Sequence, residues 1–350
     1  MRAFVTGGSG FVGKRLIAAL RAQGNEVRAL ARSEVAREAV RSAGAEAYDG
    51  DLSDVGVLQR GMTGCDVVFH AAALLSQWGK LEDFVEANVR GTERVLEAAR
   101  AAGVKRLVHV STEAVLLDGS PLVNVDERRP LPKRNIGVYP TTKNEAERRV
   151  LAANSPELAT IIVRPRMIWG TGDTSLLPQL SAVGKAGGFA WISGGRHKTS
   201  TCHVDNCVEG LILAAEKGRP GETYFVTDGE PVQVRDFISK LVGTRGVDLG
   251  TRSMPLRLIY ALAYVLEAVW RLFRLAGRPP LTRAEMLLLG QEMTLSDAKA
   301  RRELGYQGRK SIEEGLRELE QESGPGGTVE PVRPAPRELT HLPESSAHPV

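Results

Sequence analysis

Residues 3–13 read AFVTGGSGFVG, and the run KRLIAAL at residues 14–20 follows directly. An apolar run, a turn with four glycines and a second run with helical spacing predict a strand, a tight turn and a helix, in that order. Glycines in such a turn let the backbone approach a pyrophosphate without an intervening Cβ, and the helix N-terminus then holds the phosphates. The stretch therefore predicts a dinucleotide site.

The glycines of this turn fit two spacings. Gly8, Gly10 and Gly13 satisfy G-x-G-x-x-G, while Thr6 with Gly7, Gly10 and Gly13 satisfies T-G-x-x-G-x-x-G. Either spacing alone is a weak signal, because a glycine turn between a strand and a helix is also a general structural device. The residues beyond the turn have to decide between the two interpretations.

A second apolar strand is expected over residues 26–31, and the residue after such a strand meets the adenosine ribose in dinucleotide folds. An acidic residue there would bind the 2'-hydroxyl group and repel a 2'-phosphate. This chain has Ala31 followed by Arg32. A guanidinium group matches phosphate oxygens in a forked geometry, so the sequence predicts a preference for NADP(H), with NAD(H) as the alternative cofactor.

The composition of the 350-residue chain is that of an ordinary globular protein. The net charge is +4, but the basic residues are interspersed with acidic ones, which argues against nucleic acid as a partner. Cys65, Cys202 and Cys207 lack metal-ligand spacing, so we expect reduced thiols and no metal site. The first residues show no export signal, and we expect a cytoplasmic protein.

Strand and helix signals alternate through the first half, which predicts an α/β fold with a doubly wound parallel sheet. The expected strands cover residues 3–6, 26–31, 45–48, 67–70, 107–111 and 160–163, and the clearest helical patterns cover residues 84–102 and 142–153. The second half loses this rhythm, although residues 199–213 and 222–226 indicate a return to the sheet.

We therefore predict a Rossmann-type core and a smaller substrate domain that are interleaved in the sequence. The core takes residues 1–165 with a return segment at about 199–228, and the substrate-binding part takes residues 166–198 and 229–322. Residues 323–350 are rich in Pro, Gly and Ser with few apolar side chains. Such a segment cannot bury enough surface to offset its ordering entropy, so we expect a disordered tail.

Residues 254–276 read MPLRLIYALAYVLEAVWRLFRLA. Charged residues near the middle of this apolar stretch argue against a membrane span. Three interpretations stay open: a buried helix of the substrate domain, a helix that lines an apolar substrate pocket, and an interfacial helix that makes peripheral membrane contact.

Tyr139 and Lys143 form a Y-x-x-x-K pair at the start of a helical stretch. Four residues are about one helical turn, so both side chains project from the same face. An ammonium group near the phenol favours the phenolate, and we expect Lys143 to lower the pKa of Tyr139 toward working pH. Tyr139 could then exchange a proton with a substrate oxygen while a hydride moves to or from a nicotinamide.

Two hydroxyl residues, Ser111 and Thr112, follow the strand at residues 107–111. The carboxyl ends of strands in open α/β sheets face the ligand crevice, so a hydroxyl group there can meet the substrate oxygen. We choose Thr112 as the third catalytic residue. Tyr306 and Lys310 repeat the Y-x-x-x-K spacing, but the glycines at 305 and 308 argue against a helix, and we discard that pair.

With these motifs in place, residues 1–320 resemble the extended short-chain dehydrogenases/reductases. The resemblance includes Gly50-Asp51-Leu52, His70-Ala71-Ala72-Ala73, Asn88-Val89-Arg90-Gly91-Thr92, Arg164-Pro165 with Trp169-Gly170, and His203-Val204-Asp205-Asn206. It implies that Lys143 also binds the nicotinamide ribose and that Asn88 and Asp205 are structural. The position of Thr112 is often Ser in this family. The expected cofactor-binding residues are Gly7, Gly10, Phe11, Val12, Gly13, Arg32, Asp51, Leu52, Ala71, Ala72, Ser111, Tyr139, Lys143 and Pro165.

The C-terminal part resembles the 3β-hydroxysteroid dehydrogenase-like branch of that family, through residues 279–282, 297–300, 303–306 and 311–316. Residues 151–154 and 164–170 are most similar to the bacterial 2-alkyl-3-oxoalkanoate reductases. The resemblance implies an oxidoreductase that interconverts a ketone and a secondary alcohol on an apolar substrate such as a steroid, a 3-oxoacyl compound or a natural-product ketone.

Two other functions remain open at this point, a nucleotide-sugar epimerase or dehydratase and a non-catalytic dinucleotide-binding regulator. The intact Tyr139 and Lys143 pair argues against the regulator, and Arg32 in place of an acidic residue argues against the epimerase. A homodimer is an open alternative to a monomer.

Overall fold

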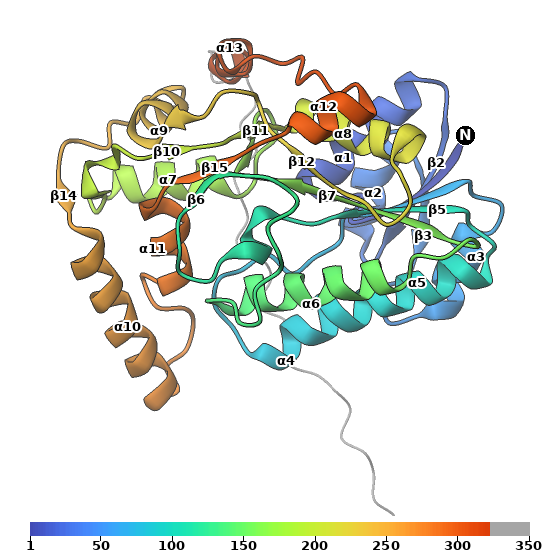
Figure 1. Cartoon of the computed structure of the whole chain (residues 1–350), viewed down its shortest axis with the longest axis horizontal. Coiled ribbons are helices and arrows are strands. Elements are labelled where there is room, and N and C mark those ends of the chain that lie inside the picture. Colours follow the sequence, from blue (N-terminus) through green and yellow to red (C-terminus); the bar gives the residue numbers. More distant parts are fainter. Residues whose placement is uncertain (323–350) are drawn as a thin grey trace, which may run out of the picture.

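A parallel sheet of seven strands forms the centre of the computed structural model, which describes residues 1–322 (Figure 1). The strand order is β12-β7-β5-β4-β1-β2-β3. The strands are β1 (Arg2–Thr6), β2 (Glu26–Ala31), β3 (Glu46–Asp49), β4 (Val67–His70), β5 (Arg106–Val110), β7 (Ala159–Pro165) and β12 (Thr223–Val226). The predicted Rossmann-type α/β fold is confirmed, while the predicted disorder of residues 323–350 lies outside the described residues.

Helices cover both faces of the sheet because the strand side chains alternate between two apolar cores. In β1, Ala3 and Val5 belong to one core, and Phe4 belongs to the other. The first core packs under α1 (Phe11–Ala22), α2 (Glu34–Ser42), α8 (Val204–Lys217) and α12 (Ala298–Leu304), and the second under α3 (Val55–Met62), α5 (Gly91–Ala101) and α6 (Val138–Ala152).

The long helix predicted over residues 84–102 is a composite. It begins as α4 (Leu81–Phe84), continues as a π-helix (Val85–Arg90) and ends as α5. The helix predicted from residue 142 begins four residues earlier, at Val138, which puts Tyr139 in the first turn of α6.

The remaining elements form a smaller unit beside the carboxyl ends of the sheet strands (Figure 1). Its four-stranded sheet has the order β13-β10-β15-β6, and two further strand pairs are β11 with β8 and β14 with β9. The strands are β6 (Leu122–Val125), β8 (Ile168–Trp169), β9 (Trp191–Ile192), β10 (Lys198–Thr199), β11 (Cys202–His203), β13 (Val232–Gln233), β14 (Ser253–Met254) and β15 (Met293–Leu295). The helices are α7 (Leu176–Lys185), α9 (Val234–Gly243), α10 (Leu256–Leu272), α11 (Arg283–Gly290) and α13 (Ile312–Glu322), with 3₁₀ turns at Glu113–Leu116 and Ser193–Gly195.

The apolar stretch at residues 254–276 forms α10, which packs against α11 and projects from the body of the molecule (Figure 1). Only Ile259, Ala263 and Glu267 of its 17 residues are buried, so the interpretation as a buried helix is wrong. No helix within residues 1–322 is both long enough and apolar enough to cross a bilayer.

The register of the parallel strands aligns three polar residues across the sheet. Thr6 of β1 pairs with His70 of β4, and His70 pairs with His109 of β5. Adjacent strands lie about 4.8 Å apart, so the glycine turn after β1 and the residues after β5 open onto the same edge of the sheet.

Candidate active site

The glycine turn after β1 is packed so tightly that side chains would not fit. Gly7 has a φ of +74°, and a Cβ there would lie 2.7 Å from the backbone nitrogen of Ala72. A Cβ at Gly13 would collide with the carbonyl oxygen of Gly7. The turn therefore brings Ala71 and Ala72, which follow β4, directly against the backbone that begins α1.

The N-terminus of α1 offers amide groups with no side-chain cap. Gly10 is the N-cap residue, and it has no side chain that could accept from the first turn of the helix. Phe11 and Val12 open the helix behind it. Free amide donors at the positive end of a helix fit a pyrophosphate, so these residues suit the nicotinamide dinucleotide that the sequence predicts.

Hydrogen bonds fix the protonation of His70 beneath this turn. The Thr92 hydroxyl donates to the Asn88 carbonyl oxygen at 2.6 Å, so Thr92 must accept the proton of His70 Nε2 at 2.9 Å. His70 Nδ1 then accepts from the Thr6 hydroxyl at 2.7 Å, and Thr6 Oγ1 accepts from the Ala72 amide. Burial lowers the pKa of His70 to about 3, so this chain is held by a neutral imidazole.

Lys143 reaches the same edge of the sheet from α6. Its Nζ donates to the carbonyl oxygen of Val110 at 2.8 Å and lies 3.1 Å from Nε2 of His109. Burial lowers the pKa of Lys143 to about 8, and the Glu147 carboxylate opposes that shift. His109 is buried, and burial and the Lys143 charge hold its pKa well below the ordinary range. His109 is therefore a neutral acceptor for the ammonium group.

Tyr139 lies one turn before Lys143 on α6, and Thr112 and Glu113 are among the groups that act on the pKa of its phenol. The pKa of Tyr139 is above its ordinary value because burial and, after it, the Glu113 carboxylate disfavour the phenolate, while the neighbouring Thr112 side chain opposes the shift. The expectation that Lys143 lowers this pKa is wrong in the structure, since its ammonium group is bonded to β5 and His109. The phenol is protonated at neutral pH.

Glu113 and Arg166 form a buried ion pair that the sequence reasoning missed. Arg166 Nη1 lies 2.5 Å from Glu113 Oε1, and both side chains are almost fully buried. The Thr112 hydroxyl donates to the other carboxylate oxygen at 2.8 Å and accepts from the Ala114 amide. The pair thus sets the orientation of Thr112. Charged residues placed directly after Thr112 and Pro165, each at the end of a strand, were the signal that could have revealed it.

Ser111 turns away from Tyr139. Its hydroxyl donates to the buried carboxylate of Glu147 at 2.6 Å, and Glu147 also forms a buried ion pair with Arg164. The choice of Thr112 over Ser111 agrees with this arrangement. The hydroxyl proton of Ser111 is taken by Glu147, so its predicted cofactor role, which stays a prediction, would use the hydroxyl oxygen or the backbone.

The residues expected at the adenosine end lie at the carboxyl ends of β2 and β3. Asp51 accepts from the Ser53 amide at 2.7 Å, and its pKa is lowered by the Ser53 hydrogen bonds and, to a lesser degree, by the Arg32 charge. Arg32 itself is exposed and makes no hydrogen bond or ion pair within residues 1–322. Leu52 packs against Gly91 at the start of α5.

Two residues that the resemblance assigned to structural roles have such contacts. Asn88, in the π-helix, accepts from the Leu74 amide at 2.7 Å and donates to Thr142 at 3.1 Å, so it joins the loop after β4 to α6. Asp205, at the start of α8, forms a bidentate ion pair with Arg15 of α1. Tyr306, from the discarded pair, is buried and donates to the Thr227 carbonyl oxygen.

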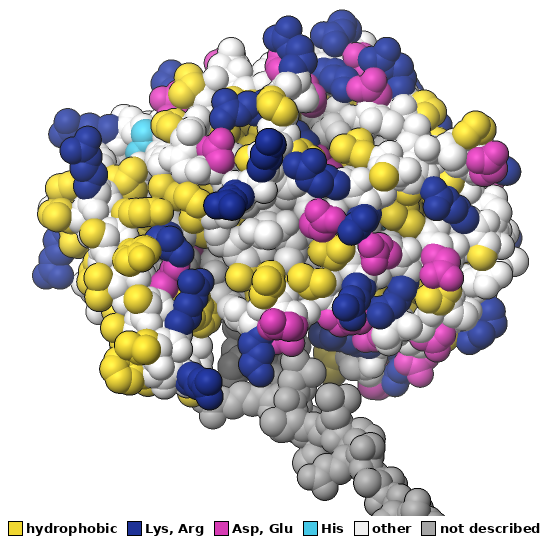
Figure 2. All heavy atoms as spheres, turned by 60° about the horizontal axis from the view of Figure 1, so that its bottom comes forward, with side chains coloured by type: hydrophobic (Ala, Val, Ile, Leu, Met, Phe, Trp, Pro, Cys, Tyr) yellow, Lys and Arg dark blue, Asp and Glu magenta, His cyan; other side chains and the backbone are white. Residues whose placement is uncertain are grey.

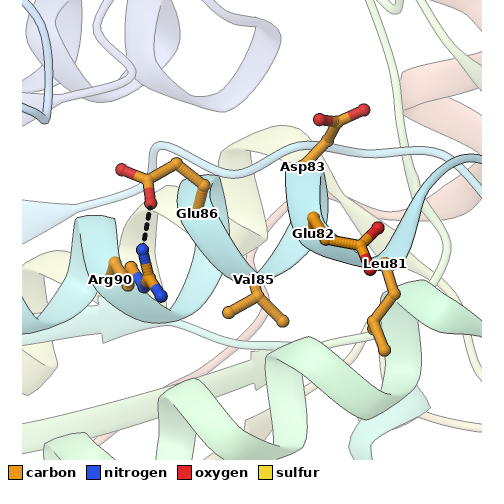
Figure 3. Close-up of a pocket in the computed structure, with 6 residues that line it drawn as sticks. All are labelled: Leu81, Glu82, Asp83, Val85, Glu86 and Arg90. Atoms are coloured by element: carbon orange, nitrogen blue, oxygen red, sulfur yellow. Dashed lines mark hydrogen bonds and ion pairs between the residues drawn. The ribbon is translucent and has the colours of Figure 1, made fainter.

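A separate shallow pocket lies on α4 and the π-helix (Figure 3). In Figure 3, Leu81 and Val85 point toward α6, whereas Glu86 pairs with Arg90 along the helix. None of the predicted site residues lines this pocket. It is therefore distinct from the edge of the sheet that holds Thr112, Tyr139 and Lys143.

Comparison with known proteins assigns the family. The sequence profile of the 3-beta hydroxysteroid dehydrogenase/isomerase family matches residues 4–256. The chain belongs to this family. It is an NAD(P)-dependent oxidoreductase of the CH–OH/C=O class, as its sequence predicts.

Individual relatives are similar over nearly their whole length. The chain is 51% identical over 327 residues to the 4-hydroxy-2-methyl-3-oxo-4-farnesyl-3,4-dihydroquinoline-1-oxide ketoreductase of Stigmatella aurantiaca, which covers 93% of this chain and 98% of that protein. It is 37% identical to a 2-alkyl-3-oxoalkanoate reductase of Stenotrophomonas maltophilia, covering 92% of this chain and 99% of that protein. The enzyme also superimposes on the dTDP-glucose 4,6-dehydratase DesIV of Streptomyces venezuelae, solved with NAD bound, with a TM-score of 0.73 and 25% identity, covering 92% of this chain and 96% of that one.

The Glu113 carboxylate should set the pH dependence of alcohol oxidation. In that direction Tyr139 must lose its proton before it can act as a base, so the rate rises with pH. The Glu113→Gln substitution removes a charge that raises the Tyr139 pKa. We expect the rising limb of kcat/KM to move to lower pH by about one unit, or ~1.4 kcal/mol of charge interaction.

Glu127→Gln is the matched control for this measurement. Glu127 is a half-buried carboxylate that accepts from the Phe225 amide and is not among the groups that shift the Tyr139 pKa. Its substitution should leave the profile where it is. An unmoved limb in folded Glu113→Gln protein, verified by thermal denaturation, would show that Glu113 does not act on the phenol.

Proposed function

We propose that the enzyme reduces a ketone on a hydrophobic substrate at the expense of NADPH, with Tyr139 as the proton donor. The observation that carries this proposal is the position of a protonated phenol at the edge of the sheet onto which the glycine turn opens. Bound at that edge, NADPH would supply a hydride to the carbonyl carbon. The chain's own residues then have to bind the oxygen and provide the proton.

Tyr139 gives its proton to the carbonyl oxygen as negative charge develops there. The raised pKa of the phenol suits a donor that must be protonated before the reaction. The Thr112 hydroxyl is oriented by Glu113 and would meet the substrate oxygen beside the phenol. Lys143 is held by the Val110 carbonyl oxygen and His109 and, as the family resemblance implies, binds the nicotinamide ribose.

The surroundings of Thr112 support an apolar substrate. Val115, Leu116 and Leu117 lie three to five residues after Thr112 and form a buried apolar core with residues of α11, against which Tyr260 of α10 packs. The relative in Stigmatella aurantiaca is named for a farnesylated quinoline oxide, and the one in Stenotrophomonas maltophilia for a 2-alkyl-3-oxoalkanoate. Both names describe a polar group that carries an apolar chain, and we infer a substrate of this kind.

The preference for NADPH over NADH rests on Arg32. The guanidinium group is exposed and unpaired within residues 1–322, directly before Ser33, which caps the N-terminus of α2. A 2'-phosphate beside Arg32 would meet its unpaired guanidinium group, whereas the nearby Asp49 and Glu34 carboxylates are both paired with Arg37.

NADPH absorbance with a panel of ketones tests the proposed function. We expect oxidation of NADPH with long-chain 3-oxoacyl esters, quinoline-derived ketones or steroid ketones, and none with UDP-sugars. A protein that retains NAD through purification and epimerises a UDP-sugar would instead be a nucleotide-sugar enzyme, and the proposal would be wrong.

Arg32→Asp tests the cofactor preference. Hydrogen bonds to charged groups contribute about 1.5–3 kcal/mol, so the substitution should reduce the ratio of kcat/KM for NADPH to that for NADH by roughly tenfold to a hundredfold. Arg41→Asp is a suitable control, because Arg41 lies on α2 with its charge paired to Glu34. A wild-type enzyme without preference for NADPH would refute the assignment.

A further inference from the structure

Helix α10 has an apolar face that nothing in residues 1–322 covers. Leu258, Leu262, Val265 and Leu272 are spaced by three, four or seven residues and so share one side of the helix. Their exposed fractions are 61, 43, 55 and 77%. Phe273 and Leu275 extend the same exposed surface beyond the end of the helix. We call these six residues the α10 surface.

The α10 surface is not the outer rim of a buried face. The buried residues Ile259, Ala263 and Glu267 are spaced by four, and at 100° per residue they lie on the opposite side of the helix. That inner side packs on α11, and Glu267 pairs there with Arg283. The helix thus has two apolar sides, and only the inner side packs against α11.

The charges around the α10 surface are nearly all positive. Residues 252–283 contain six arginines and one acidic residue, Glu267, which is buried. Arg257 and Arg274 are exposed and pair with no carboxylate within residues 1–322, while Arg278 is paired with Glu285 just beyond this stretch. Figure 2 shows apolar side chains gathered on the side of the molecule where α10 lies, with Lys or Arg side chains among them.

Helix α10 contacts the loop that follows β4. The Arg271 guanidinium stacks 5.1 Å from the ring centre of Trp78, in the loop that follows β4. Leu74 and Leu75 of that loop are exposed as well, and Leu74 is bonded through Asn88 to Thr142, between Tyr139 and Lys143. The loop that borders the cofactor turn therefore contacts α10 and exposes apolar side chains of its own.

We propose that the α10 surface docks on an anionic lipid bilayer, with the helix lying flat in the interface. An apolar face flanked by arginines is the pattern of interfacial helices, in which apolar side chains enter the acyl boundary and cations meet the headgroups. Docked this way, the enzyme faces the lipid phase in which a substrate with a long apolar chain dissolves. This last point rests on the proposed function, whereas the docking itself does not.

The charge pattern favours lipid over a second copy of the chain. A symmetric dimer through the α10 surface would bring the unpaired Arg257 and Arg274 of the two copies together, while Glu267 and Glu285 are already paired with other arginines. Anionic headgroups complement the same arginines. The lipid surface therefore explains both the exposed apolar side chains and the one-sided charge, while a homodimer here explains only the first.

Vesicle sedimentation tests the docking with purified full-length protein. The probes are phosphatidylcholine vesicles and vesicles in which part of the lipid is phosphatidylglycerol. We expect binding to the anionic vesicles that weakens with added salt, and at least about tenfold weaker binding after the combined substitution Leu258→Glu, Val265→Glu and Leu272→Glu. Val35→Glu combined with Val123→Glu is the matched control, because both valines are exposed elsewhere, and it should bind as the wild type does.

Three outcomes would overturn the proposal. The first is no binding to anionic vesicles, and the second is equal loss of binding in the control variant. The third is a dimer in light scattering that the α10 substitutions dissociate while no vesicle binding is found. Catalytically inactive protein should still bind vesicles, so failure of docking and failure of the proposed function are separate results.

Discussion

The in-register alignment of β1, β4 and β5 is the constraint on which the site depends. Because parallel strands end at the same edge, Thr6, His70 and His109 form one row across the sheet. The row is buried, and its histidines stay neutral because burial disfavours their charged forms. Neutral imidazoles can accept hydrogen bonds, and they fix the glycine turn at one end of the row and the Lys143 ammonium at the other. A slip of one residue in any of these strands would reverse the side chains and separate the turn from α6.

Two buried ion pairs accept hydrogen bonds from the hydroxyl residues at the end of β5 and so set their orientation. Glu147 with Arg164 lies under Lys143 and receives the Ser111 hydroxyl, while Glu113 with Arg166 receives the Thr112 hydroxyl. Buried pairs of this kind add little to stability, since desolvation offsets most of their attraction. Here they distinguish two adjacent hydroxyl residues, turning one into the core and the other toward Tyr139. The Glu113 charge also raises the pKa of the Tyr139 phenol, after burial, which is the larger cause.

Local patterns in the sequence were sufficient for the sheet, the glycine turn and the Tyr139 and Lys143 pair. Strand alternation and glycine spacing are short-range signals. The family resemblance then indicated the 3β-hydroxysteroid dehydrogenase-like branch. The contacts of His109, Glu113 and Arg166 could not be predicted in the same way, because each joins elements far apart in the chain. The effect of Lys143 on Tyr139 was predicted from spacing alone, and it is wrong because β5 offers the ammonium group closer acceptors. The burial of α10 was also overestimated, since hydropathy does not show how many sides of a helix find a partner.

A single-turnover experiment with Tyr139→Phe tests the central role of the phenol most directly. The variant lacks only the hydroxyl group, so NADPH should bind with nearly the wild-type affinity by fluorescence titration. We predict that the rate of NADPH oxidation on mixing with the ketone falls by about 10²–10⁴-fold, the range that general acid catalysis contributes. A single-turnover rate within a fewfold of the wild type would contradict the role of Tyr139 as the proton donor.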